Sequence, residues 1–237
     1  MLVAAAVCPH PPLLVPGLAG ARAGELDGLR TACLRAIDAM RATEPDLLVL
    51  VGAGEMTRRH PPGTAGSLAA YGVDVPVVLP GEAPGRSGGE LPLSLLVGAW
   101  LLGQARWSAQ VRGQEVARST DPDECRRIGI QLARKTDRLA MLVMGDGSAC
   151  RSADAPASFD SRAEAFDMAV VDALRAGDPA ALLAIDPETA TQLVVAGRAP
   201  WQVLAGAAED AVFDADVLYA GAPFGVGYFV AVWERHG

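Results

Sequence analysis

The sequence predicts an α/β fold in one domain spanning residues 1–237. Three continuous apolar runs, at 2–7, 47–51 and 139–144, are typical of strands covered on both faces. Patterns with apolar residues three and four positions apart, as in 25–41, separate these runs and predict helices. This alternation favours a sheet that is mostly parallel or mixed, and 51% hydrophobic residues are enough for a large core.

The remaining elements follow from the same periodicities. Further strands are expected at 75–79, 109–116, 212–219 and 227–233, and further helices at 91–102, 122–136, 161–175, 179–185, 187–195 and 201–209. Asp121 before Pro122 is a typical helix N-cap, and Ser161 with Glu164 matches a capping box. Residues 55–72 are expected to be an irregular loop, and 82–89 an exposed, mobile one.

Composition narrows the classes of function. A net charge of −8 without a basic stripe argues against nucleic-acid binding. The four cysteines are widely spaced and form no CxxC pair, which suits a reducing compartment. No apolar window is long enough for a membrane span. The chain is therefore expected to be a soluble, cytoplasmic protein with no membrane partner.

Three predicted strands end in unusual polar segments. These are Cys8-Pro9-His10, Gly52-Ala53-Gly54-Glu55 and Gly145-Asp146-Gly147-Ser148. Ligands of open α/β sheets bind beyond the carboxyl ends of the strands. If the three strands are parallel neighbours, His10, Glu55 and Asp146 converge in one cleft.

Imidazole and carboxylate groups together suit a divalent metal. His10, Glu55 and His60 would form a set of two histidines and one carboxylate, and Glu234 and His236 are further candidates near the C-terminus. A simpler interpretation is also open, in which His10 caps a strand end and Glu55 and His60 are ordinary loop residues. The sequence alone does not decide between a metal site and ordinary loop residues.

The order of several segments resembles the LigB superfamily, the catalytic-subunit-like proteins of the class III extradiol dioxygenases. The segments are CPHPPLLVPG, LLVLVGAGE, LLVMGDGSA, FDSRAEAFDMAVVDAL, GRAPWQVLAGA and APFGVGYFVAVW. The resemblance implies a three-layer α/β/α fold. It also implies a non-haem Fe(II) held by two histidines and a glutamate, a catechol-type aromatic substrate, and a further histidine for acid/base chemistry.

The implied site residues carry over unevenly. The first metal-binding histidine of the family falls on His10, and the second falls at Glu55, with His60 five residues later. The acid/base histidine falls at Ala149, so Asp146 and Ser148 are the candidate catalytic residues in that segment. The third ligand has Glu234 as its nearest counterpart by position only.

The first functional hypothesis is a class III extradiol dioxygenase-like enzyme that uses Fe(II) or another divalent metal to cleave a catechol-type ring. The alternative is a diverged relative without that activity, either a zinc-dependent enzyme of another reaction or a protein that binds a small molecule or a partner without catalysis. A small aromatic molecule is the expected ligand, although in the non-catalytic case the cleft could hold another small molecule or nothing. Analogy with the family favours a homo-oligomer, such as a dimer.

Overall fold

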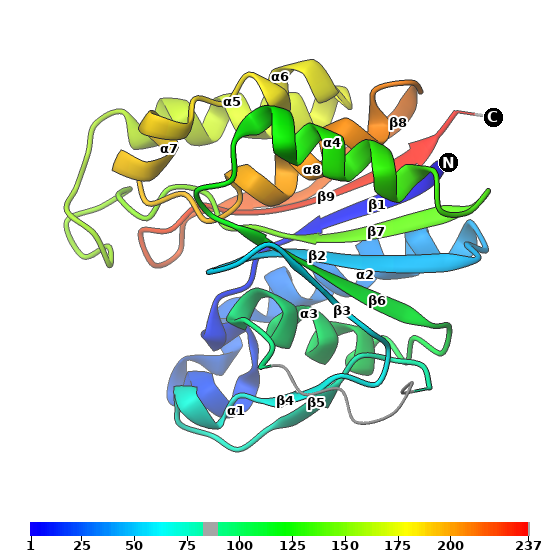
Figure 1. The fold of residues 1–237 in the computed structure, drawn as a ribbon. Helices are drawn as coiled ribbons and strands as arrows, with labels where there is room; N and C mark the ends of the chain where they lie inside the picture. Colours follow the sequence, from blue (N-terminus) through cyan, green and yellow to red (C-terminus); the bar gives the residue numbers. More distant parts are fainter. Residues whose placement is uncertain (83–89, 237) are drawn as a thin grey trace.

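A mixed sheet of seven strands forms the centre of the protein in the computed structural model, which describes residues 1–82 and 90–236 (Figure 1). The strand order is β3-β6-β2-β7-β1-β9-β8. Their bounds are β1 Leu2–Cys8, β2 Leu47–Gly54, β3 Arg58–His60, β6 Val111–Ala117, β7 Leu139–Met144, β8 Phe213–Gly221 and β9 Tyr228–Arg235. A separate two-stranded sheet pairs β4 (Ala65–Ser67) with β5 (Pro76–Val78).

The four central strands run parallel, their outer neighbours β3 and β9 run antiparallel to them, and the edge strand β8 again has the direction of the central four. Strand β7 pairs in parallel with both β1 and β2, and β2 pairs in parallel with β6. Strand β9 is antiparallel to β1, β8 is antiparallel to β9, and β3 is antiparallel to β6. The carboxyl ends of β1, β7, β2 and β6 therefore meet at one end of the sheet. The polar strand ends singled out in the sequence belong only to the first three of these strands.

Helices cover both faces of this sheet and give three layers (Figure 1). One face carries α1 (Pro16–Ala19), α2 (Asp27–Ala42) and α3 (Leu93–Gln104), with the β4–β5 hairpin beyond them. The opposite face carries α4 (Pro122–Ala133), α5 (Ala163–Ala176), α6 (Pro179–Leu183), α7 (Pro187–Gln192) and α8 (Arg198–Ala208). Short 3-10 helices lie at Pro12–Leu14, Gly20–Leu26 and Ala69–Tyr71.

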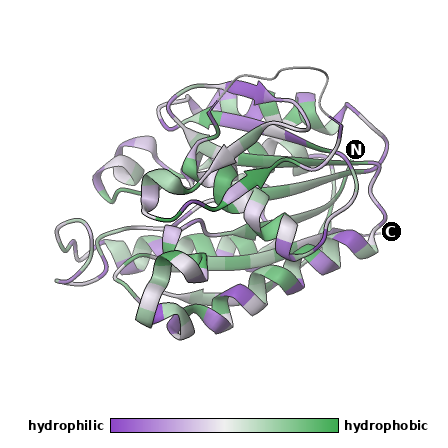
Figure 2. Cartoon of the chain, turned by 90° about the horizontal axis from the view of Figure 1, so that it is seen from below, coloured by the Kyte–Doolittle hydropathy of each residue, from purple (hydrophilic) through white to green (hydrophobic). Residues whose placement is uncertain are grey.

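Strand β2 shows how one apolar run serves two cores. Leu48 and Leu50 pack with the α2 and α3 side, whereas Val49 and Val51 pack with the α4 and α8 side. Successive side chains of a strand point to opposite faces, so a strand between two helical layers must be apolar throughout. Figure 2 shows the same pattern, with hydrophobic residues along the central strands and hydrophilic ones on the outer helical surfaces.

The three-layer α/β fold confirms the predicted class, and most elements lie within a few residues of their expected positions. Asp121 caps α4 as predicted, because its side chain accepts the amide N–H of Asp123. The capping box at Ser161 is wrong: α5 begins at Ala163, its N-cap is Arg162, and no side-chain cap is formed.

The irregular loop expected over 55–72 is also wrong in part. It contains β3, the edge strand of the main sheet, and β4. Strand β3 is only three residues long and reads Arg-Arg-His, so no apolar pattern marks it. The loop expected over 82–89 lies, from residue 83, outside the described residues.

Candidate functional site

A cleft of about 420 Å³ opens at the carboxyl ends of the parallel strands. Its polar lining includes His10, Glu55, Glu115 and Arg118, which follow or end β1, β2 and β6. Its apolar lining comes from the segment before and within α3 and from the 3-10 helix on the same face, with Leu91, Pro92, Leu93, Leu96 and Tyr71. Of the three residues predicted to converge here, His10 and Glu55 line the cavity and Asp146 does not.

His10 is fixed by the strand end that precedes it. The prolines at 9, 11 and 12 have no amide N–H and stop the sheet ladder after Cys8. The backbone N–H of His10 instead donates to Asp146 Oδ1 at 2.7 Å, which ties the end of β1 to the end of β7. His10 is only 4% exposed, so its ring orientation is determined by packing.

The imidazole of His10 has an unusual polar environment. Its Nδ1 lies 3.5 Å from Asp146 Oδ1, but the atom is buried and has no hydrogen-bond partner. Burial lowers the pKa of His10; the nearby Asp146 opposes this shift and Arg118 adds to it. His10 is thus held as a neutral imidazole at the wall of the cleft. Its Nδ1 is buried and faces Asp146, a residue that does not line the cleft, so a ligand in the cleft does not reach this nitrogen.

The segment Gly52-Ala53-Gly54 leaves room for side chains that form the floor of the cleft. A Cβ on Gly52 would lie 2.4 Å from Ser94 Oγ, and one on Gly54 would lie 2.2 Å from Glu115 Oε1. Ser94 donates its hydroxyl to the carbonyl of Ala53 at 2.6 Å. The two glycines therefore serve close packing, and they do not form a dinucleotide-binding loop.

Glu115 forms a buried polar group with two neighbours on β3. Its Oε2 accepts from Arg58 Nε at 2.6 Å and lies 3.0 Å from His60 Nε2. The side chains of Glu115 and His60 are each 3% exposed. Burial alone would raise the pKa of Glu115, but the hydrogen bonds from Arg58, His60 and the Met56 amide lower it overall. Glu115 is therefore ionised at neutral pH.

The predicted metal ligands are not brought together as a set. His10 and Glu55 line the same cleft, whereas His60 is bonded to Glu115 and lines a different cavity. Over residues 1–82 and 90–236, no cluster of three or more histidine, cysteine, aspartate or glutamate side chains could hold a metal ion. The described donor set does not fit a site of two histidines and one carboxylate.

The two C-terminal candidates lie toward the amino-terminal ends of the central parallel strands, away from the cleft. Glu234 pairs with Ala4 at the end of the β1–β9 ladder that is remote from His10. At the rise of an extended chain, the six residues from Ala4 to His10 place Glu234 roughly 20 Å from the cleft. His236 is exposed and bonded to Asp214 Oδ2 at 3.1 Å. Neither residue can join His10.

The two candidate catalytic residues have different environments. Asp146 contacts His10 directly, as described above. Ser148 is completely buried, and both its backbone N–H and its hydroxyl donate to Asp167 at 2.8 Å. Arg151 donates to the same carboxylate at 3.1 Å. Ser148 therefore holds the loop after β7 in place, and Ala149, also buried, leaves that position without an acid or base.

Sequence reasoning missed Glu115 and Arg118 as lining residues of the cleft. Both lie at or just beyond the end of β6, whose predicted span stopped at 116. The rule that led to His10, Glu55 and Asp146 could have found them, since β6 is a fourth parallel strand with the same direction. Its mixed sequence, Val-Arg-Gly-Gln-Glu-Val-Ala, hid this role.

Comparisons with known proteins establish the fold alone. No family model matches the chain, and no curated protein matches it. Among solved structures, the chain is similar to the crystal structure of an uncharacterized protein, JW3007, from Escherichia coli K12. The TM-score is 0.58 at 13% sequence identity, and the match covers 98% of this chain and 99% of the other. No helix in the described part of the chain is long and apolar enough to cross a membrane.

Proposed function

We propose that this chain is a diverged relative of the class III extradiol dioxygenases that binds a small hydroxylated aromatic molecule in the cleft at the carboxyl ends of the strands. The observation that carries the proposal is that His10, whose Nδ1 lies 3.5 Å from Asp146 Oδ1, lines this cleft together with the cationic Arg118 and several apolar side chains. The ancestry rests on the sequence resemblance.

The chemistry of the cleft supports an aromatic ligand with acidic substituents. An apolar wall that includes Leu91, Pro92 and Leu96 suits the face of a ring. Arg118, which forms no ion pair with the described residues, suits a carboxylate or a phenolate oxygen. A cavity of about 420 Å³ lies in the range typical of small-molecule sites.

His10 and Asp146 supply the acid/base chemistry of this site. A neutral imidazole can accept a proton from a ligand hydroxyl, and the adjacent Asp146 carboxylate stabilises the imidazolium that results. Arg118 favours the ionised ligand that remains. Deprotonation of a bound phenol is the reaction step that these residues support.

A divalent metal, Fe(II) or zinc, is the second candidate occupant, and it rests on the sequence resemblance alone. His10 and Glu55 would be its protein ligands in the cleft. The described residues lack the second histidine of the family, so this candidate ranks below metal-free binding.

The test combines calorimetry with metal analysis on protein purified without chelators or a histidine tag. We expect saturable binding of 3,4-dihydroxybenzoate, weakened about tenfold or more in His10→Ala, because a hydrogen bond to a buried or charged group contributes about 1.5–3 kcal/mol. The control His236→Ala alters a histidine that is exposed and far from the cleft.

Mass-spectrometric metal analysis of the same samples separates the two candidates. About one iron or zinc per chain, lost in His10→Ala, would replace metal-free binding with the metal candidate. Absence of aromatic binding to protein both as purified and after loading with Fe(II) would overturn the proposed function.

The proposal includes two further expectations, on oligomeric state and on cellular location. We expect a homodimer, which light scattering on the purified chain tests. We also expect a reducing, cytoplasmic location, because the four cysteines are free and buried.

A further inference from the structure

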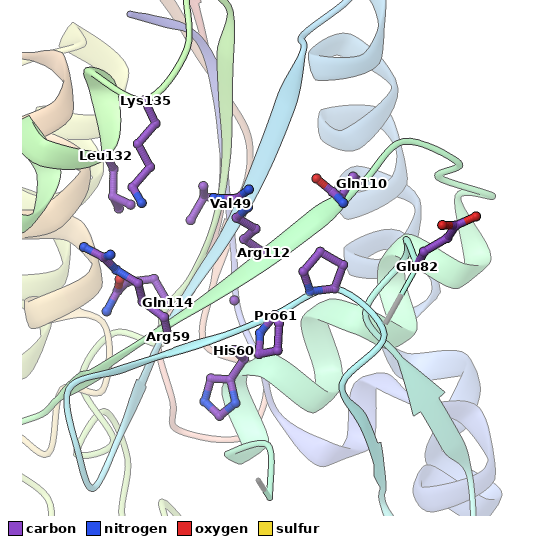
Figure 3. Close-up of a pocket in the computed structure, with 12 residues that line it drawn as sticks. Val49, Arg59, His60, Pro61, Glu82, Gln110, Arg112, Gln114, Leu132 and Lys135 are labelled. Atoms are coloured by element: carbon purple, nitrogen blue, oxygen red, sulfur yellow. The ribbon is translucent and has the colours of Figure 1, made fainter. Parts of the chain in front are cut away.

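A second cavity, of about 390 Å³, lies at the edge of the sheet between β3, β6 and the end of α4 (Figure 3). It is separate from the cleft that contains His10. Three cationic side chains line it: Arg59 from β3, Arg112 from β6, and Lys135 just beyond α4. Lys135 is the only lysine in the chain.

Strand register places these side chains on the same face of the sheet. Arg112 is opposite Val49 in the β2–β6 pair, and Val49 packs in the core on the α4 side. Arg59 is opposite Gln114 in the β3–β6 pair, and Gln114 is two residues from Arg112. Opposed residues point to one face, as do residues two apart. Figure 3 shows the ends of Arg59, Arg112 and Lys135 around the space beside Gln114 and Leu132.

None of these three cations has an ionic partner among the described residues. No carboxylate there lies within 4.0 Å of the charged groups of Arg59, Arg112 or Lys135. Glu82 also lines the cavity, but Figure 3 places it beside Gln110, at the other end. By contrast, many other arginines are paired with carboxylates, among them Arg58, Arg126 and Arg162. Three unpaired cations around one cavity are notable in a chain with a net charge of −8.

The cations are close enough to repel one another. The pKa of Lys135 is lowered, first by partial burial and then by the positive charges of Arg59 and Arg112. An anion among the three groups would remove this repulsion. The arrangement therefore has a cost in the free protein that a ligand of the opposite charge relieves.

We propose that this pocket binds the phosphoryl group of a small molecule. Two guanidinium groups can each donate paired N–H bonds to phosphoryl oxygens, and an ammonium group supplies a third charge from another direction. Val49 and Leu132 offer apolar surface to the rest of the molecule. This site is independent of the proposed aromatic cleft.

The test uses pyrophosphate as the probe and the single lysine as a reporter. Reductive ¹³C-methylation labels only Lys135 and the chain's amino terminus and keeps both charges. In a pyrophosphate titration we expect the Lys135 methyl resonance to shift with saturation. The N-terminus is bonded to the carbonyl of Thr136, next to Lys135, so the shift of the Lys135 resonance is compared with that in Arg112→Gln, where we expect it to be smaller at the same pyrophosphate concentration.

Calorimetry on variants then assigns the site. Arg112→Gln and Lys135→Gln should each weaken pyrophosphate binding about tenfold, the effect of one hydrogen-bonded charge. The matched control is Arg134→Gln, which removes a positive charge next to Lys135 without removing a lining residue. No saturable shift of the Lys135 resonance, or an equal loss in Arg134→Gln, would overturn the proposal. Citrate that binds as tightly as pyrophosphate would overturn its phosphoryl specificity.

Discussion

The two cavities of this protein differ in how their charges are balanced. The cleft at the strand ends mixes Glu55 and Glu115 with Arg118 and a neutral His10. The edge pocket gathers Arg59, Arg112 and Lys135 around one end, with Glu82 at the other. A mixed lining suits a ligand that exchanges protons and has an apolar ring, whereas gathered cations suit a ligand with several negative charges.

The difference also reflects how each cavity is built. The cleft follows from strand direction, because parallel strands bring their carboxyl ends to one edge. The edge pocket requires β3 to pair with β6 and α4 to end above them. Glu115 and His60, bonded to each other, lie between the two: Glu115 lines the cleft and His60 lines the pocket.

The largest expected effect comes from removing Glu115, which lines the cleft and is bonded to His60 of the edge pocket. Glu115→Ala should lower the free energy of unfolding by about 3 kcal/mol, because breaking a buried ion pair typically costs 3–5 and the partly exposed Arg58 can regain water. Urea denaturation measures this change. The control Glu124→Ala removes the carboxylate of an exposed pair with Arg127 and should cost under about 0.5 kcal/mol. Equal losses of unfolding free energy in the two variants would show that the bonds of Glu115 to Arg58 and His60 do not stabilise the fold more than an exposed ion pair does.

A smaller effect should appear in the dependence of stability on pH. The pKa of Glu115 is lowered in the folded state, so its contribution is fully present above the unfolded value of about 4.3. It is lost as the pH falls through the lower folded value. The stability gap between the native chain and Glu115→Gln should therefore be widest near neutral pH and narrow below about pH 4. A gap that widens in acid would contradict an ionised Glu115.

The smallest expected effects are the cross-effects between the cavities. Lys135→Gln should leave 3,4-dihydroxybenzoate binding within about twofold, and Arg118→Gln should leave pyrophosphate binding within about twofold, since distant sites act almost independently. Calorimetry of both probes with both variants checks this. A change of tenfold in either cross-experiment would show that the cavities act as one site.

The fold and half of the cleft could be predicted from the sequence. Apolar runs predicted the central strands, and the polar ends of two of them place His10 and Glu55 in one cleft, whereas Asp146 contacts His10 without lining that cleft. Strand β3 could not be predicted, because a three-residue polar edge strand is stabilised by its pairing with β6. For the same reason His60, five residues from Glu55, was grouped with a cleft that it does not line.

Local sequence by itself determined where the chain forms buried strands and where prolines and glycines interrupt them. The sequence also limited the protein to three histidines, which the fold separates into the cleft, the β3 edge and the C-terminal end. Only the tertiary structure decided which charges are balanced. Glu115 meets Arg58 and His60, while Arg59, on the other face of the same short strand, meets Arg112 and Lys135. Adjacent residues of a strand point to opposite faces. Arg58 is therefore paired with a carboxylate, whereas the next residue, Arg59, faces other cations.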